Sequence, residues 1–103
     1  MNIERGKWLV IRCDGSQEEK TWNGGKASTL AIHTAIGCDC CDTVVLRKSA
    51  DSMEAEIVMM VDDTGMIDGK PINQKATELY HQVRRTPYSI HGDVAIVNDE
   101  DFA

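Results

Sequence analysis

The chain has 103 residues, of which 42% are hydrophobic and 5% aromatic, and its formal net charge is −6. This length fits one domain spanning residues 1–103, which can bury a core without disulfides or metal. The acidic charge argues against direct binding to nucleic acid, because neutralising phosphates requires a basic surface. No apolar run is long enough to cross a bilayer, and no apolar signal segment follows Met1. We therefore expect a cytoplasmic protein with reduced cysteines and no membrane partner.

The first half of the chain predicts a β-hairpin and then a helix. Residues 7–13 are rich in strand formers, Asp14-Gly15 is typical of a hairpin turn, and residues 17–22 form a polar second strand. Residues 26–36 predict a helix that ends at Gly37. Helical spacing assigns its apolar face to Ala27, Leu30, Ala31, Thr34 and Ala35.

The second half predicts two strands, a helix and a last strand. Strands are expected at 42–48 and at 54–61, where apolar residues alternate, and a helix should run from the cap at Asn73 to about Val83. A strand at 90–97 and a frayed acidic tail at 98–103 complete the chain. The order ββαββαβ predicts an α+β fold: a mostly antiparallel sheet with both helices on one face.

If one face of the sheet lacks a helix, it should be partly exposed to solvent. Val58 and Met60 would lie on that face, because they alternate with the core residues of the same strand. An exposed apolar patch of this kind is typical of an interaction surface, so the sequence predicts a homodimer.

The chain is organised around the stretch 61–75, which links the fourth strand to the second helix. Turns are expected at Asp63, whose side chain can bond the backbone, and at Gly65 and Gly69, which can adopt positive φ. Gly92, inside the last predicted strand, indicates a bulge or a close approach of backbone. We expect this stretch to serve the architecture of the fold.

The densest chemical signal is Gly37-Cys38-Asp39-Cys40-Cys41-Asp42, to which Cys13 or His33 could add a further zinc ligand. However, adjacent residues of a strand point to opposite faces, so Cys38, Cys40 and Cys41 should not all reach one ion. The neighbouring aspartates would also raise the pKa of the thiols and disfavour redox chemistry. We therefore expect packing cysteines, with no metal and no cofactor.

Ligand-binding residues are expected in loops, because loops on a rigid scaffold are where such residues concentrate. Gly24-Gly25-Lys26 precedes a predicted helix and could hold an anion there. Together with backbone amides near Gly25, the candidates are Lys26, Arg84, Arg85, His91 and Asp93. No catalytic residue is predicted, since no nucleophile, phosphate-binding or dinucleotide motif occurs.

The second half of the chain resembles a small uncharacterised domain encoded by phages, plasmids and bacteria. The matching residues are Val61-Asp62-Asp63-x-Gly65, then Gly69-x-Pro71-x-Asn73-x-x-Ala76-x-x-Leu79, then Ile90-x-Gly92-Asp93-x-x-Ile96-Val97. The helix at 26–36 and the strand from Thr43 are similar to the first half of that family. The resemblance implies an accessory gene of a mobile element and carries no known activity.

Three classes of function follow. The first is a non-enzymatic protein that captures a host signalling nucleotide or inhibits a host defence protein. The second is an acidic mimic that blocks a nucleic-acid-binding host protein, for which the net charge of −6 is the motivation. The third is a metal-dependent enzyme, which would need the cysteine cluster or the aspartates of the central stretch as ligands.

Overall fold

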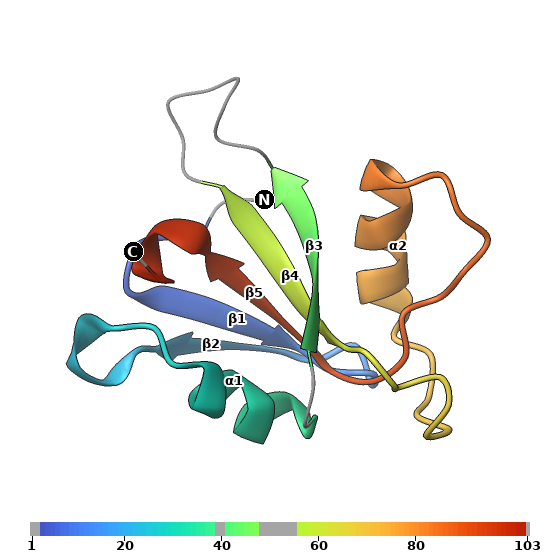
Figure 1. The fold of residues 1–103 in the computed structure, drawn as a ribbon, viewed down its shortest axis with the longest axis horizontal. Helices are drawn as coiled ribbons and strands as arrows, with labels where there is room; N and C mark the ends of the chain where they lie inside the picture. Colours follow the sequence, from blue (N-terminus) through green and yellow to red (C-terminus); the bar gives the residue numbers. More distant parts are fainter. Residues whose placement is uncertain (1–2, 39–40, 48–55, 103) are drawn as a thin grey trace.

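A computed structural model describes residues 3–38, 41–47 and 56–102. The strands are β1 (Lys7–Ile11), β2 (Gln17–Thr21), β3 (Cys41–Arg47), β4 (Ile57–Asp62) and β5 (Val94–Asn98), and the helices are α1 (Thr29–Ile36) and α2 (Gln74–Val83) (Figure 1). There are also two short 3₁₀ helices: η1 (Asn23–Gly25) precedes α1, and η3 (Asp99–Phe102) ends the described chain.

The described strands form one antiparallel sheet in the order β2-β1-β5-β4-β3. The α+β class and the order ββαββαβ are therefore confirmed. The chain's last strand lies at the centre of the sheet because Val94–Val97 is apolar on both faces and almost completely buried. The polar β2 lies at an edge of the sheet, where its side chains can face water.

The expectation that both helices cover one face is wrong. Along β4, Ile57, Met59 and Val61 share a core with α2, whereas Val58 belongs to the core beneath α1. Successive residues of a strand point to opposite faces, so the two helices lie on opposite sides of the sheet (Figure 1). The reason is that β4 and β5 are apolar on both faces, and each apolar face requires a covering layer.

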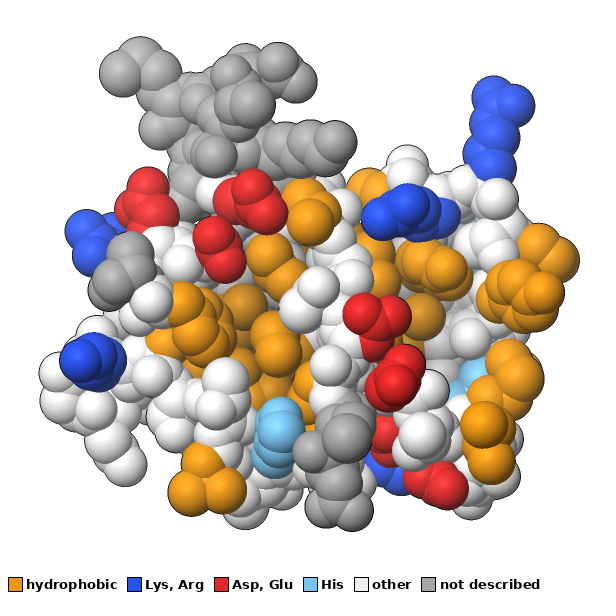
Figure 2. Space-filling view, viewed as in Figure 1, with side chains coloured by type: hydrophobic (Ala, Val, Ile, Leu, Met, Phe, Trp, Pro, Cys, Tyr) orange, Lys and Arg blue, Asp and Glu red, His pale blue; other side chains and the backbone are white. Residues whose placement is uncertain are grey.

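This arrangement removes the argument for a dimer through the uncovered face. Val58 is only 6% exposed, and Met60 is partly buried against the core beneath α1. In the space-filling view, hydrophobic side chains gather both between the strands and α1 and beside α2 (Figure 2). Dimerisation itself stays an untested expectation.

Helix α1 uses a different face from the predicted one. Its side chains Ile32 and Ile36 are buried, whereas Leu30 is 75% exposed. The pair of isoleucines one turn apart buries more apolar surface than the predicted face, which consists largely of alanines. The helix begins after Ser28, whose hydroxyl accepts a hydrogen bond from the Ala31 amide, and ends at Gly37 as predicted.

The central stretch follows its expected path with two corrections. Asn73 caps α2, and Gly69 has a φ of +74°, both as predicted. Gly65 does not adopt positive φ; a Cβ there would lie 2.5 Å from the His91 carbonyl oxygen, so glycine is needed for close approach. The turn is bonded by Asp62, which accepts from Thr64, while Asp63 is exposed.

The last predicted strand is shorter than expected. It begins at Val94 because Gly92, with a φ of +93°, turns the chain before it. The Gly92 amide donates to the Pro71 carbonyl at 2.9 Å, and a Cβ would lie 3.0 Å from the Lys70 side chain. The predicted close backbone approach at Gly92 is therefore confirmed, and no bulge is needed to explain it.

The acidic tail is ordered through residue 102, contrary to the frayed tail that we expected. Asp101 is buried, and its carboxylate accepts hydrogen bonds from the Gly6 amide and from Nε1 of Trp22. These bonds join the tail to both ends of the β1–β2 hairpin.

In the described part of the chain, no helix is long and apolar enough to cross a membrane.

Candidate functional site

A groove of about 800 Å³ lies between α1 and the β1–β2 hairpin. We call it the α1–β2 groove; its principal lining residues are Trp8, Lys20, Trp22, Lys26, Leu30 and Thr34. It exists because α1 packs over β4 and β5, leaving a channel above the hairpin at the sheet edge. Clefts of this size are typical of sites for small molecules.

Two tryptophans form the aromatic wall of the groove. The rings of Trp8 and Trp22 are stacked, with centroids 4.6 Å apart and an angle of 8° between their planes. Phe102 contacts Trp22 edge-on at 6.0 Å, and Asp101 accepts from Trp22 Nε1 at 2.9 Å. Asp101 and Phe102, in the tail that the sequence predicts to be frayed, therefore hold Trp22 in place.

The charges of the groove are mixed. Nζ of Lys20 lies 5.9 Å from the ring centroid of Trp8, where a cation is attracted to the indole. The same ammonium pairs with Glu18 at 2.7 Å and lowers the pKa of that carboxyl. Lys26 is exposed at the mouth of the groove, just after Gly25, whose φ is +71°.

The structure does not bring all of the predicted ligand-binding residues together. Gly25 and Lys26 belong to the segment before α1, whereas Arg84 and Arg85 follow α2 at the other end of the molecule (Figure 1). The helix N-terminus of α1 is capped by Ser28, so the Gly25 amide does not form an anion site on it. Of these four residues, only Lys26 lines the groove.

His91 and Asp93 have structural partners in the described chain. Nδ1 of His91 is 2.8 Å from the Lys70 carbonyl oxygen, which fixes the ring against the central stretch. Asp93 accepts from the Cys13 amide at 2.9 Å and pairs with Arg12 at 3.4 Å. Asp93 therefore joins the end of β1 to the start of β5, His91 joins the segment before β5 to the central stretch, and neither residue lines the groove.

Sequence reasoning missed most of the groove. The sequence places Trp8 only in a strand and Lys20 only in a polar strand. Leu30 was placed in the core, although it is exposed beside the groove. A usable signal was the pairing of the two predicted strands of the hairpin, which places Trp8 opposite Lys20.

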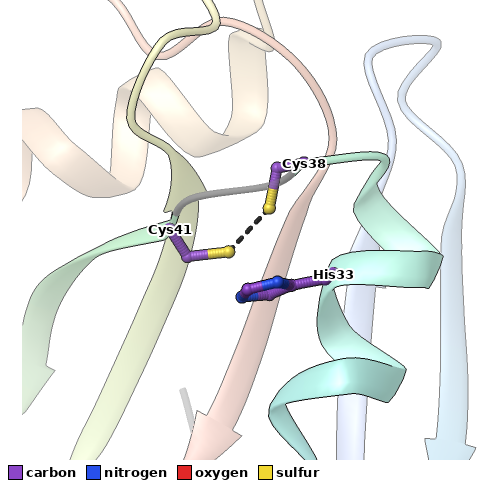
Figure 3. A group of neighbouring side chains, drawn as sticks. All are labelled: His33, Cys38 and Cys41. Atoms are coloured by element: carbon purple, nitrogen blue, oxygen red, sulfur yellow. Dashed lines mark hydrogen bonds between the residues drawn. The ribbon is translucent and has the colours of Figure 1, made fainter.

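A second cluster comprises His33, Cys38 and Cys41 (Figure 3). Their ligand atoms all lie within 4.8 Å of one another, and the two sulfurs are 2.6 Å apart. Cys13 is elsewhere, with its Sγ 3.5 Å from the Pro71 carbonyl oxygen; burial and then Asp93 raise the pKa of its thiol. Cys40 lies outside the described residues.

Comparison with curated proteins and with solved structures finds no significant match. Comparison with protein families matches residues 6–103 to the family described as "Domain of unknown function (DUF3846)". That span includes both the groove and the His33–Cys38–Cys41 cluster, and it confirms the resemblance to a small uncharacterised domain. The chain therefore belongs to this family of domains of unknown function.

Proposed function

We propose that the protein binds a small anionic molecule with a planar ring, such as a nucleotide, in the α1–β2 groove, without turnover. The observation that carries this proposal is the combination of a tryptophan wall with Lys20 and Lys26 in one groove of about 800 Å³. An aromatic wall suits a planar ring, and two ammonium groups suit a phosphate.

The position of Lys20 suggests how a ligand would be accommodated. Its ammonium covers the Trp8 ring, and its side chain is 34% exposed, so it can move without disturbing the core. A planar base in that place would stack on the indole, which is worth about 1–3 kcal/mol per base. The displaced Lys20 would then pair with a phosphate, together with Lys26.

The same residues argue for binding rather than catalysis. A catalyst needs an activated group and a partner whose pKa is tuned the opposite way. Glu18, a carboxylate of the groove, is already paired with Lys20, and its lowered pKa makes it a weak base. In the proposed role the bound molecule is sequestered unchanged.

The biological setting is part of the proposal and follows from the family resemblance. An accessory protein of a phage or other mobile element could sequester a nucleotide that the host uses as a signal. This would act in the host cytoplasm and would need no further partner. If no small molecule binds, direct inhibition of a host defence protein is the alternative function.

Calorimetry against a panel of cyclic and ADP-ribose-type nucleotides tests the proposal. We expect the wild type to bind at least one member, and Lys20→Ala and Lys26→Ala each to weaken that binding by at least about tenfold. Arg84→Ala is the matched control, because it removes an exposed cation that does not line the groove. Failure of every nucleotide to bind, or an equal loss in the control, would contradict the proposal.

A further inference from the structure

The cluster of His33, Cys38 and Cys41 is assembled from two elements that meet at one end of α1 (Figure 3). His33 projects from the last turn of α1, Cys38 follows the helix directly, and Cys41 is the first residue of β3. The imidazole and both thiols point toward a common centre (Figure 3).

The backbone explains why these side chains meet. Gly37 adopts the left-handed conformation, with a φ of 68°, and reverses the chain at the end of α1. The amides of Gly37 and Cys38 then both donate to the His33 carbonyl, at 2.9 and 3.1 Å. Cys38 is thereby held next to His33 by main-chain bonds that do not depend on any metal.

The opposite side of the cluster is fixed independently. Cys41 pairs with Asp62 across the β3–β4 ladder, and the Asp62 carboxylate accepts a hydrogen bond from Lys70. The same ammonium donates to the Gly37 carbonyl at 2.7 Å. Lys70 therefore ties the turn that carries Cys38 to the strand that faces Cys41.

We propose that His33, Cys38 and Cys41 form a binding site for a soft divalent cation, of which Zn²⁺ is the leading example. Thiolate and imidazole are the preferred zinc ligands, with bonds of about 2.3 Å and about 2.0–2.1 Å. Three protein ligands leave the fourth position of a tetrahedron for water or for an exogenous ligand. The site would join α1 to β3.

Metal binding requires only a small adjustment of the sulfurs. Two thiolates bound tetrahedrally at about 2.3 Å lie about 3.8 Å apart, which is about 1 Å more than the present 2.6 Å. Cys41 can provide this movement by a side-chain rotation, because β3 is an edge strand and Cys41 is only partly buried.

The sequence predicts no zinc site on the assumption that the three clustered cysteines lie in one strand, where neighbouring side chains point to opposite faces. Cys38 instead lies in the turn before β3, so it is free of the strand alternation. The site needs two of the cysteines and the histidine one turn earlier.

The surroundings favour a metal over a redox disulfide. Redox-active thiols are often found at helix N-termini, whereas Cys38 lies beyond the C-terminal end of α1. His33 would also have no function in a disulfide, whereas it supplies the third metal ligand here.

Cobalt provides a direct test, because Co²⁺ bound by thiolates has characteristic absorption bands. We expect reduced, metal-free wild-type protein to bind one Co²⁺ per chain with those bands, and Zn²⁺ to displace it. His33→Ala and Cys41→Ser should each weaken Co²⁺ binding by more than about 100-fold, since even outer-shell partners are worth 10–100-fold. Both positions are only partly buried, so these variants should keep the fold.

Cys13→Ser is the matched control, because it removes a thiol that is not part of the cluster and should leave the bands unchanged. Circular dichroism of every variant checks that it is folded. The proposal is overturned if the folded wild type takes up no metal, or if uptake survives both ligand substitutions. It is equally overturned if mass mapping of metal-free protein finds a Cys38–Cys41 disulfide that persists under the reducing conditions of the titration.

Discussion

The carboxylate of Asp101 accepts a hydrogen bond from Nε1 of Trp22 at 2.9 Å, and both residues are buried. It also accepts from the Gly6 amide at 3.0 and 3.1 Å. One acidic side chain near the end of the chain therefore holds the aromatic wall of the α1–β2 groove and the start of the hairpin.

Replacing this carboxylate should destabilise the fold. Asp101→Ala leaves two buried or partly buried donors without their acceptor, and we expect a loss of about 2–4 kcal/mol in the free energy of unfolding. Urea denaturation followed by tryptophan fluorescence measures it. Asp99→Ala, an exposed acid in the same 3₁₀ helix, should change stability by less than about 0.5 kcal/mol; equal effects would contradict the assigned role.

Asn73 should cost more to replace than an ordinary helix cap. Its side-chain oxygen accepts from the Ala76 amide at 3.0 Å, while its side-chain nitrogen donates to the carbonyls of Ile11 and Gly92 at 2.9 and 3.1 Å. Asn73→Ala should therefore lose about 2–4 kcal/mol, against about 1 kcal/mol for the cap alone.

Asn73→Asp separates the two contributions, because it keeps the capping oxygen and removes both donors. Chemical denaturation should find it at least as unstable as Asn73→Ala, since a carboxylate would face two carbonyl oxygens. A stability equal to that of the wild type would mean that only the cap matters.

The elements of this fold could be predicted from the sequence because local chemistry specifies them. Asn73 and Gly37 mark a helix start and a helix end by backbone preferences that need no tertiary context. The polar β2 could likewise be placed at an edge, since its composition alone disfavours a central position. These rules explain why the strand and helix order was confirmed.

The layers and the groove could not be predicted, because they depend on contacts between distant residues. Val58 and Met60 gave no local sign of which helix would cover them. Asp101 looked like part of a solvated acidic run, and only its distance from Trp22 shows otherwise. The meeting of His33 with Cys41 likewise depends on the turn at Gly37, which spacing along a strand does not describe.

Steric contact, rather than a positive φ, should be what requires glycine at position 65. A Cβ at this position would lie 2.5 Å from the His91 carbonyl oxygen, so Gly65→Ala must displace backbone and should cost about 1–3 kcal/mol. Gly69→Ala is the comparison, because its added Cβ meets nothing within 4 Å and only its φ of +74° is strained. Thermal unfolding of the two variants should rank Gly65→Ala as the less stable, and the reverse order would refute the steric argument.

The ion pair of Asp62 with Lys70 predicts a loss of stability in acid. Burial acts to raise the pKa of Asp62, but hydrogen bonds from Lys70 and Thr64 outweigh it, so the pKa lies below its ordinary value. Because its pKa is lower in the folded state, the Asp62 carboxylate stabilises the protein at pH values above its unfolded-state pKa of about 3.9. This contribution is lost as the pH falls through the folded-state pKa.

Asp62→Asn should therefore be less stable than the wild type near pH 7, and the difference should shrink as the pH falls below about 4. Urea midpoints measured from pH 7 to pH 2 follow this change. Asp63→Asn controls for the loss of a charge at the neighbouring exposed position. A difference between Asp62→Asn and the wild type that stays constant across that range would show that the carboxylate charge is not what stabilises the fold.

Native mass spectrometry of protein purified gently from nucleotide-rich cells can detect a small molecule captured in the α1–β2 groove. We expect the chain of 11.4 kDa to carry a nucleotide-sized adduct that is released unaltered on denaturation and is absent from the Lys20→Ala, Lys26→Ala double variant. The claim is contradicted if the wild type carries no small molecule, or if the double variant retains the same adduct.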